Sequence, residues 1–136
     1  MRFSKEEEYL RQKDKKLKKI IDTNGHIVFK PVKNNQFDTL VGIIISQFIS
    51  TKAANSIFKN IRNNFNSGYL NEKHFQKLTI NEIKELGLSA NKAKTIKELS
   101  NFFLNHRVID ISKLNDDLLS IFGIGPWSVS MFEIFC

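Results

Sequence analysis

Residues 118–132 read Leu-Leu-Ser-Ile-Phe-Gly-Ile-Gly-Pro-Trp-Ser-Val-Ser-Met-Phe, and this stretch decides the fold. Two glycines, Gly123 and Gly125, flank one apolar residue, so the backbone can turn sharply and leave amide N–H groups exposed. Pro126 favours the first position of a new helix, whose positive end then lies beside the turn. Such a turn suits a phosphate, and the alternative is an ordinary helix corner without a ligand. In either case we expect Ile124 to anchor the turn in the core.

The residues upstream of this turn also carry a helical pattern. Apolar residues recur at helical spacing, and residues that favour helix starts precede them. Ser4 and Thr79 are each followed three residues later by Glu, as in a capping box. No alternating pattern of useful length indicates a strand, so the sequence predicts an all-α domain of about six to eight short helices. We expect one helix between Ser4 and Asn24, one that carries the apolar residues from Phe37 to Phe48, and one that starts at Asn115 or Asp116.

Length and composition fit one globular domain. The chain has 136 residues, of which 41% are hydrophobic and 26% are charged, and this mixture argues against disorder. The one cysteine, Cys136, excludes an intrachain disulfide, and no apolar run approaches the roughly 20 residues of a membrane span. The N-terminus is charged where a signal peptide would be apolar. We therefore expect a cytoplasmic protein with no membrane partner.

The net charge favours a polyanionic partner. Twenty-one Lys and Arg residues against fourteen Asp and Glu residues give a formal charge of +7. A basic domain is attracted to nucleic acid or to an anionic membrane. Charge alone leaves the question open, because the lysines between Lys13 and Lys19 fit equally well the solvated face of a helix.

Three blocks of sequence, in the same order, resemble the helix-hairpin-helix DNA glycosylases of the 3-methyladenine DNA glycosylase II type. Residues 118–129 resemble the hairpin pattern Leu-x-x-Ile-x-Gly-Ile-Gly-Pro-Trp-Thr-Ala. Residues 37–54 resemble Phe-x-x-Leu-Val followed by Ile-x-Gln-Gln-x-Ser-x-x-Ala-Ala, and residues 86–93 resemble Leu-Gly-Leu-Ser-x-x-Lys-Ala. The resemblance implies a helical DNA glycosylase domain over residues 37–136. Residues 1–36 would form an N-terminal helix and connector, to which the resemblance assigns no role.

The resemblance implies base excision repair of alkylated DNA. Such enzymes bind double-stranded DNA, flip the damaged base out and hydrolyse its N-glycosidic bond. It further implies a monomer associated with the nucleoid. The hairpin would grip a DNA phosphate through amides near Gly123, Gly125 and Trp127, with Ile124 between them. No cofactor would be required, although a structural Na⁺ or K⁺ would suit three main-chain carbonyls, those of Leu119, Ile121 and Ile124.

The resemblance also assigns side chains to the DNA and to the damaged base. Gln47, Phe48 and Lys92 would face the DNA, with Phe48 as the wedge that fills the gap left by the flipped base. Trp127 and Met131 would line the base pocket, where an indole face attracts a cationic alkylated base. Core packing remains the alternative for both aromatic residues, and periodicity by itself favours it for Phe48.

The resemblance predicts a monofunctional hydrolase and leaves its catalytic residue unassigned. Bifunctional relatives carry a lysine nucleophile where this sequence has Trp127. The family's catalytic aspartate would lie beyond Cys136, so we expect a domain that is incomplete at its C-terminus and inactive as it stands. The alternatives are a non-catalytic helix-hairpin-helix module that binds duplex DNA, and a small basic helical protein that binds RNA or another protein.

Overall fold

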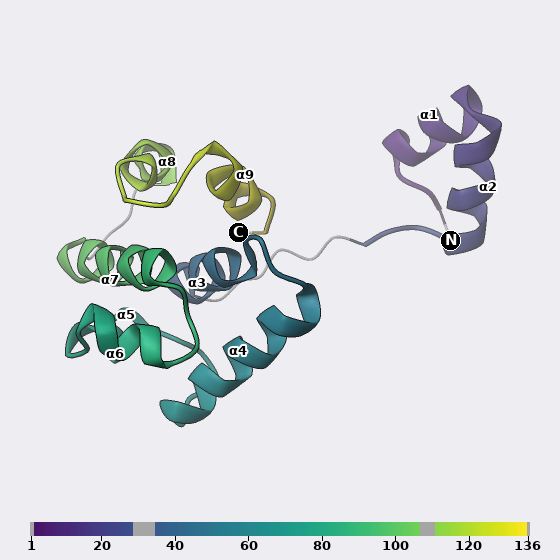
Figure 1. The fold of residues 1–136 in the computed structure, drawn as a ribbon. Helices are drawn as coiled ribbons and strands as arrows, with labels where there is room; N and C mark the ends of the chain where they lie inside the picture. Colours follow the sequence, from purple (N-terminus) through teal and green to yellow (C-terminus); the bar gives the residue numbers. More distant parts are fainter. Residues whose placement is uncertain (1, 29–34, 107–110, 136) are drawn as a thin grey trace. The chain divides into compact units, whose positions relative to one another are not determined.

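The computed structural model describes residues 2–28, 35–106 and 111–135 (Figure 1). Within these ranges the secondary structure is helical and includes no strand, which confirms the predicted all-α class. The chain divides into two compact units, Met1–Lys30 and Pro31–Cys136, whereas the sequence placed a boundary after residue 36. The helices are α1 (Lys5–Lys13), α2 (Lys15–Asn24), α3 (Gln36–Ser46), α4 (Thr51–Asn64), α5 (Glu72–Gln76), α6 (Ile80–Glu85), α7 (Ala90–Asn105), α8 (Ile111–Leu119) and α9 (Pro126–Phe135).

The first unit is a pair of helices, so the single helix predicted between Ser4 and Asn24 is wrong. Asp14 breaks the helix with an extended backbone, and its carboxylate accepts hydrogen bonds from two N–H groups of α2. Aspartate competes well for such N–H groups, which explains the break. The capping box of Ser4 and Glu7 is present as predicted. Arg11 of α1 joins Asp22 of α2 through a 2.7 Å ion pair.

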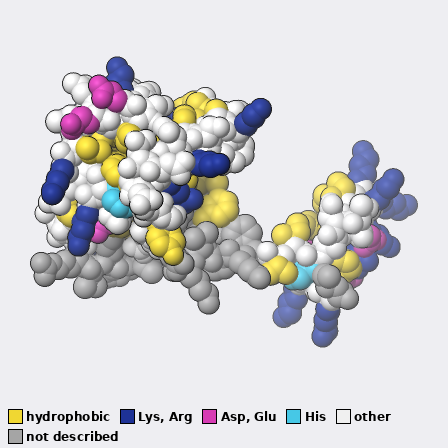
Figure 2. Space-filling view, turned by 90° about the horizontal axis from the view of Figure 1, so that it is seen from below, with side chains coloured by type: hydrophobic (Ala, Val, Ile, Leu, Met, Phe, Trp, Pro, Cys, Tyr) yellow, Lys and Arg dark blue, Asp and Glu magenta, His cyan; other side chains and the backbone are white. Residues whose placement is uncertain are grey.

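No residue of α1 or α2 is buried. Lysine and arginine side chains project from this unit into solvent (Figure 2). The lysines between Lys13 and Lys19 therefore lie on a solvated surface, as expected if they form the solvated face of a helix. No helix within the described ranges is both long enough and apolar enough to span a membrane.

The core of the second unit is built around α3, which contacts α4, α7 and α9. Ile43, Ile44 and Ile45 are all buried although they are consecutive, so this helix meets protein on most of its sides. The other fully buried large side chains come from α3 to α8 and from the segment before α5. They are Phe37, Leu40, Ile61, Leu70, Phe75, Ile83, Ile96, Leu99, Leu114 and Leu118.

Residues that favour helix starts do precede the helices of this unit. Ser50 caps α4, Asn71 caps α5 and Ser89 caps α7, each by accepting a backbone N–H in the first turn. The capping box of Thr79 and Glu82 opens α6. Gly87, at a φ of 106°, follows the end of α6. These local signals hold because each cap depends only on residues within one helical turn.

Two helix boundaries differ from the predictions. Helix α8 begins at Ile111, earlier than the predicted start at Asn115 or Asp116, because Leu114 and Leu118 lie four residues apart and are both fully buried. Packing of the face that carries Leu114 and Leu118 extends α8 toward its N-terminus, beyond Asn115 and Asp116. Helix α3 ends at Ser46, so Phe48 lies outside the helix that was expected to include it.

Candidate nucleic-acid interface

The turn between α8 and α9 is held by backbone hydrogen bonds and by two buried isoleucines. The N–H of Ile121 donates to the carbonyl of Leu118 at 3.1 Å, and the N–H of Ile124 donates to the carbonyl of Ile121 at 3.1 Å. Ile121 and Ile124 are buried, which confirms the anchor predicted for Ile124. The apolar side chains face the core, and the glycine backbone lies toward the surface.

Gly123 is required by its backbone and by its neighbour. Its φ is 79°, in the region that residues with a Cβ rarely adopt. A Cβ at this position would lie 2.1 Å from the Oγ1 of Thr95, a buried residue of α7. That hydroxyl donates to the carbonyl of Asn91 at 2.9 Å, so it is itself held in place. The inner side of the hairpin is therefore fitted closely against α7.

Helix α7 also holds Phe122, the residue before Gly123. The Oε2 of Glu98 accepts the N–H of Phe122 at 3.0 Å. The ammonium of Lys94 lies 4.1 Å from the centre of the Phe122 ring, within cation–π range. One turn of α7 therefore contacts both the backbone and the ring of this residue.

Gly125, unlike Gly123, has open space around its Cα. Its φ lies outside the left-handed region, and a Cβ built on it would meet no atom within 4 Å. In the described part of the chain, no hydrogen bond uses the backbone N–H groups of Gly123, Gly125 or Trp127. Unpaired N–H groups beside the start of α9 attract an anion, because the helix dipole is positive there. No contact among the described residues explains why position 125 is glycine, whereas close approach of a ligand would.

Two exposed aromatic side chains stand beside this backbone. Phe48 is 104% exposed and has a φ of 59°, and Trp127 is 58% exposed. Neither side chain is a core residue, so the core-packing alternative is wrong for both. They line a hollow of about 490 Å³ together with Ser46, Gln47, Gly123, Gly125 and Ser128. The fold thus brings together five residues that the sequence assigned to DNA.

Gln47 and Lys92 are engaged with the protein itself. The side-chain amide of Gln47 donates to the Oγ of Ser128, which is buried in the first turn of α9. The ammonium of Lys92 donates to the carbonyls of Ile45 and Gln47 at 2.7 and 2.6 Å. Burial lowers the pKa of Lys92. Its charge is thus directed at the end of α3, although it was expected to face DNA.

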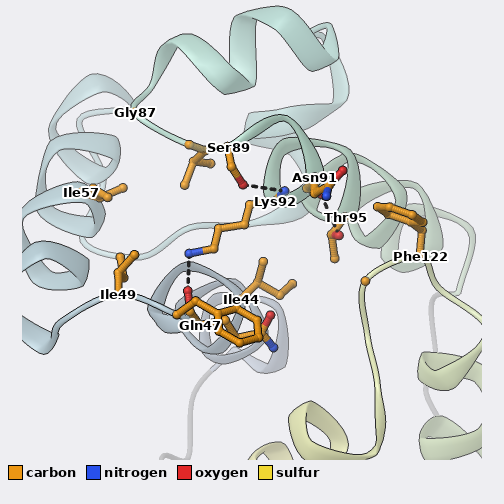
Figure 3. A pocket seen from close by; sticks show the side chains of 13 residues that line it. Ile44, Gln47, Ile49, Ile57, Gly87, Ser89, Asn91, Lys92, Thr95 and Phe122 are labelled. Atoms are coloured by element: carbon orange, nitrogen blue, oxygen red, sulfur yellow. Dashed lines mark hydrogen bonds between the residues drawn. The ribbon is translucent and has the colours of Figure 1, made fainter.

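Lys92 belongs to a second hollow, of about 480 Å³, that shares Gln47, Phe48 and Gly123 with the first. Figure 3 shows its side chain reaching from α7 toward the carbonyl of Gln47. The other walls of this hollow are mainly apolar. They include Ile44, Ile49, Ile57, Leu88 and Phe122.

Residues 41–125 match the family model of the HhH-GPD superfamily of base excision DNA repair proteins. The chain belongs to this family. A DNA-3-methyladenine glycosylase 1 from Schizosaccharomyces pombe is 24% identical over 146 residues, which cover 98% of this chain and 63% of that protein. The chain therefore spans less than two thirds of the length of this relative.

Solved structures share the fold. A 3-methyladenine DNA glycosylase from Schizosaccharomyces pombe, in complex with abasic DNA, matches with a TM-score of 0.79 and 24% identity, over 97% of this chain and 69% of the other. A DNA-3-methyladenine glycosidase from Bacillus halodurans matches with a TM-score of 0.72 and 25% identity, over 97% of this chain and 64% of the other.

The remaining site predictions for this HhH-GPD protein concern Met131 and three main-chain carbonyls of the hairpin. Met131 is half-buried and packs against the core, and it is not among the residues that line the hollow beside Trp127. The carbonyl of Ile121 accepts the N–H of Ile124, while no described backbone hydrogen bond uses the carbonyls of Leu119 or Ile124. Because a carbonyl oxygen has two lone pairs, all three retain capacity for a monovalent cation.

Sequence reasoning missed several residues that shape this interface. Thr95 and Glu98 of α7 fit the inner side of the hairpin, and Ser128 holds Gln47. Each acts through a partner more than twenty residues away in the chain, and no local pattern marks such a pair. Ser128 alone gives a weak signal, as a small polar residue next to the apolar face of α9.

Proposed function

We propose that the protein acts in base excision repair by binding duplex DNA that carries an alkylated base of the 3-methyladenine type. The observation that carries this proposal is the hollow between Phe48 and Trp127, which opens beside the unpaired N–H groups of the hairpin. Membership of the HhH-GPD superfamily and the names of the relatives support it.

The hairpin would supply the grip on the DNA backbone. The N–H groups of Gly123, Gly125 and Trp127 would donate to one phosphate, and the absence of a side chain at Gly125 lets that phosphate approach. A Na⁺ or K⁺ held by the carbonyls of Leu119, Ile121 and Ile124 would add positive charge on the same side. This arrangement needs no particular base sequence.

The two aromatic side chains would act on the bases. Phe48, wholly exposed, would enter the stack where the damaged base has left it. Trp127 would present its ring to the flipped base, and a cationic methylated base gains from both stacking and cation–π attraction. Such a base also leaves the duplex at lower cost than an intact one.

The chemistry we propose is monofunctional hydrolysis, because Trp127 stands where bifunctional relatives carry a lysine nucleophile. No Asp or Glu is among the described residues that line the hollow. The residues named here therefore account for binding and recognition, and none of them is assigned as the catalytic residue. The same observation favours a second candidate, a non-catalytic module that binds duplex DNA. A protein with either role would act on the chromosome, in the nucleoid.

Competitive binding separates the candidates. We would measure the affinity of the chain for a duplex with a stable abasic-site analogue, for the same duplex undamaged, and for both with the Phe48→Ala variant. The proposed function predicts tighter binding to the abasic duplex and loss of that preference in the variant. Equal affinity for the two duplexes would favour the non-catalytic module, and no binding to either would overturn both candidates. Release of 3-methyladenine from methylated DNA, assayed in parallel, tests hydrolysis separately, and we expect none from this chain, because none of its residues is assigned as the catalytic residue.

A further inference from the structure

The end of α3 leads into an unusual turn. The helix ends at Ser46, and Phe48 then adopts a φ of 59°, a conformation that glycine or asparagine usually fills at helix ends. A bulky residue rarely adopts this conformation, because its Cβ then crowds the following carbonyl oxygen. Such strain persists only where the surrounding structure holds it. Something near Phe48 must therefore stabilise the turn.

Lys92 is placed to do so. Its ammonium donates to the carbonyl of Ile45 at 2.7 Å and to that of Gln47 at 2.6 Å, directly before the strained residue (Figure 3). The last carbonyls of a helix lack partners within the helix, and the negative end of the dipole attracts a cation. No carboxylate in the described ranges forms an ion pair with Lys92. Its charge is thus committed to these two carbonyls.

The same turn is held from its other side. The side-chain amide of Gln47 donates to the Oγ of Ser128, the residue after Trp127. Gln47 is therefore fixed through its backbone by α7 and through its side chain by α9. Between these two attachments the chain has little freedom, and Phe48 follows directly. This links the position of Phe48 to that of Trp127 across the hollow.

We propose that Lys92 is a positioning residue that holds Phe48 in its exposed, positive-φ conformation, and that it is not a ligand of DNA phosphate. The proposal rests on the proposed function in one respect, namely that Phe48 contacts DNA. The resemblance placed Lys92 on the DNA. A direct contact between its ammonium and a phosphate would require the ammonium to leave two short hydrogen bonds.

The first experiment needs no DNA. Backbone NMR resonances of Phe48 would be compared in the wild type and in the Lys92→Met and Lys97→Met variants. Lys97 is a matched control, because its ammonium donates to the carbonyls of Phe75, Gln76 and Leu78 at the end of α5. We expect Lys92→Met to move the Phe48 shifts away from positive-φ values, and Lys97→Met to leave them unchanged. Unchanged Phe48 shifts in a folded Lys92→Met variant would overturn the proposal.

The second experiment uses a double-mutant cycle on DNA binding. Lys92→Met and Phe48→Ala should each weaken binding to abasic-site DNA by about 5- to 100-fold, the range for loss of one aromatic stack on a base. The double variant should be no weaker than Phe48→Ala alone, and the salt dependence should not change. A phosphate ligand would instead give additive losses and reduce the salt slope by about 0.9.

The two experiments distinguish a failure of the proposed function from a failure of the role proposed for Lys92. If the wild type does not bind DNA, the proposed function is wrong, while the NMR comparison still decides whether Lys92 sets the conformation of Phe48. If binding is selective but the two losses are additive, the role of Lys92 is wrong and the proposed function stands.

Discussion

The inner and outer sides of the hairpin contain the same residue type for different reasons. On the inner side, Gly123 has a positive φ and lies against Thr95 with no room for a Cβ. On the outer side, Gly125 has an ordinary φ and open space in front of it. The fold is enough to require glycine at position 123, whereas no contact among the described residues requires it at position 125, where a ligand would. A substitution on the inner side should therefore affect stability first, and one on the outer side should affect binding first.

The largest effect is expected from Gly123→Ala. The positive φ and the overlap with Thr95 together should destabilise the protein by about 2–5 kcal/mol. Urea denaturation of the purified variant measures this loss. Stability equal to that of the wild type would mean that the hairpin does not need glycine on its inner side.

Gly125→Asp should have a smaller effect, and on a different property. We expect the free energy of unfolding to change by no more than about 0.5 kcal/mol, since the site is open. Affinity for duplex DNA should fall by about 10- to 100-fold, because a carboxylate would stand where a phosphate is to bind. Gly68→Asp is the matched control, because it adds the same charge at another open position and should leave binding nearly unchanged. If both variants bind equally well, the outer side is not a phosphate site.

Trp127→Ala tests the proposed contact between the Trp127 ring and the flipped base. Affinity for DNA with a cationic methylated base should fall by about 3- to 30-fold, as loss of a cation–π contact predicts. Binding to the abasic duplex should change less, because that duplex presents no base to the ring. Tyr69→Ala removes an aromatic ring of similar exposure outside the hollow and serves as the control. Equal losses on both duplexes would contradict the pocket role.

The smallest effect is expected from Glu98→Ala, back on the inner side. Loss of the hydrogen bond to the N–H of Phe122 should cost about 1 kcal/mol of stability. Affinity for DNA should stay within about twofold of the wild type. Thermal unfolding and a fluorescence titration measure the two quantities. Weaker DNA binding at unchanged stability would place Glu98 on the functional side of the hairpin.

How far the sequence predicted this structure depends on how local each determinant is. The hairpin turn and the capping boxes at Ser4 and Thr79 follow from residues within one turn of each other, and these predictions are confirmed. The break at Asp14 is also local, but a periodic run of leucine and isoleucine on both sides concealed it.

The functional surface is less predictable because its contacts are distant in sequence. Periodicity placed Phe48 in the core, since it continues the apolar pattern of α3, yet the structure leaves it wholly exposed. The resemblance put Lys92 on the DNA, yet its ammonium lies on the carbonyls of Ile45 and Gln47. Neither outcome can be deduced without knowing which helices meet at the end of α3.

The most direct test of the central claim is an NMR titration of the ¹⁵N-labelled protein with a short duplex that contains an abasic-site analogue. We predict that the amide resonances of Gly125, Trp127 and Phe48 shift progressively with added DNA. The amides of Thr95 and Leu99, on the inner side and in the core, should shift far less. Shifts confined to the lysine-rich helices α1 and α2, with the hairpin amides unchanged, would contradict the account.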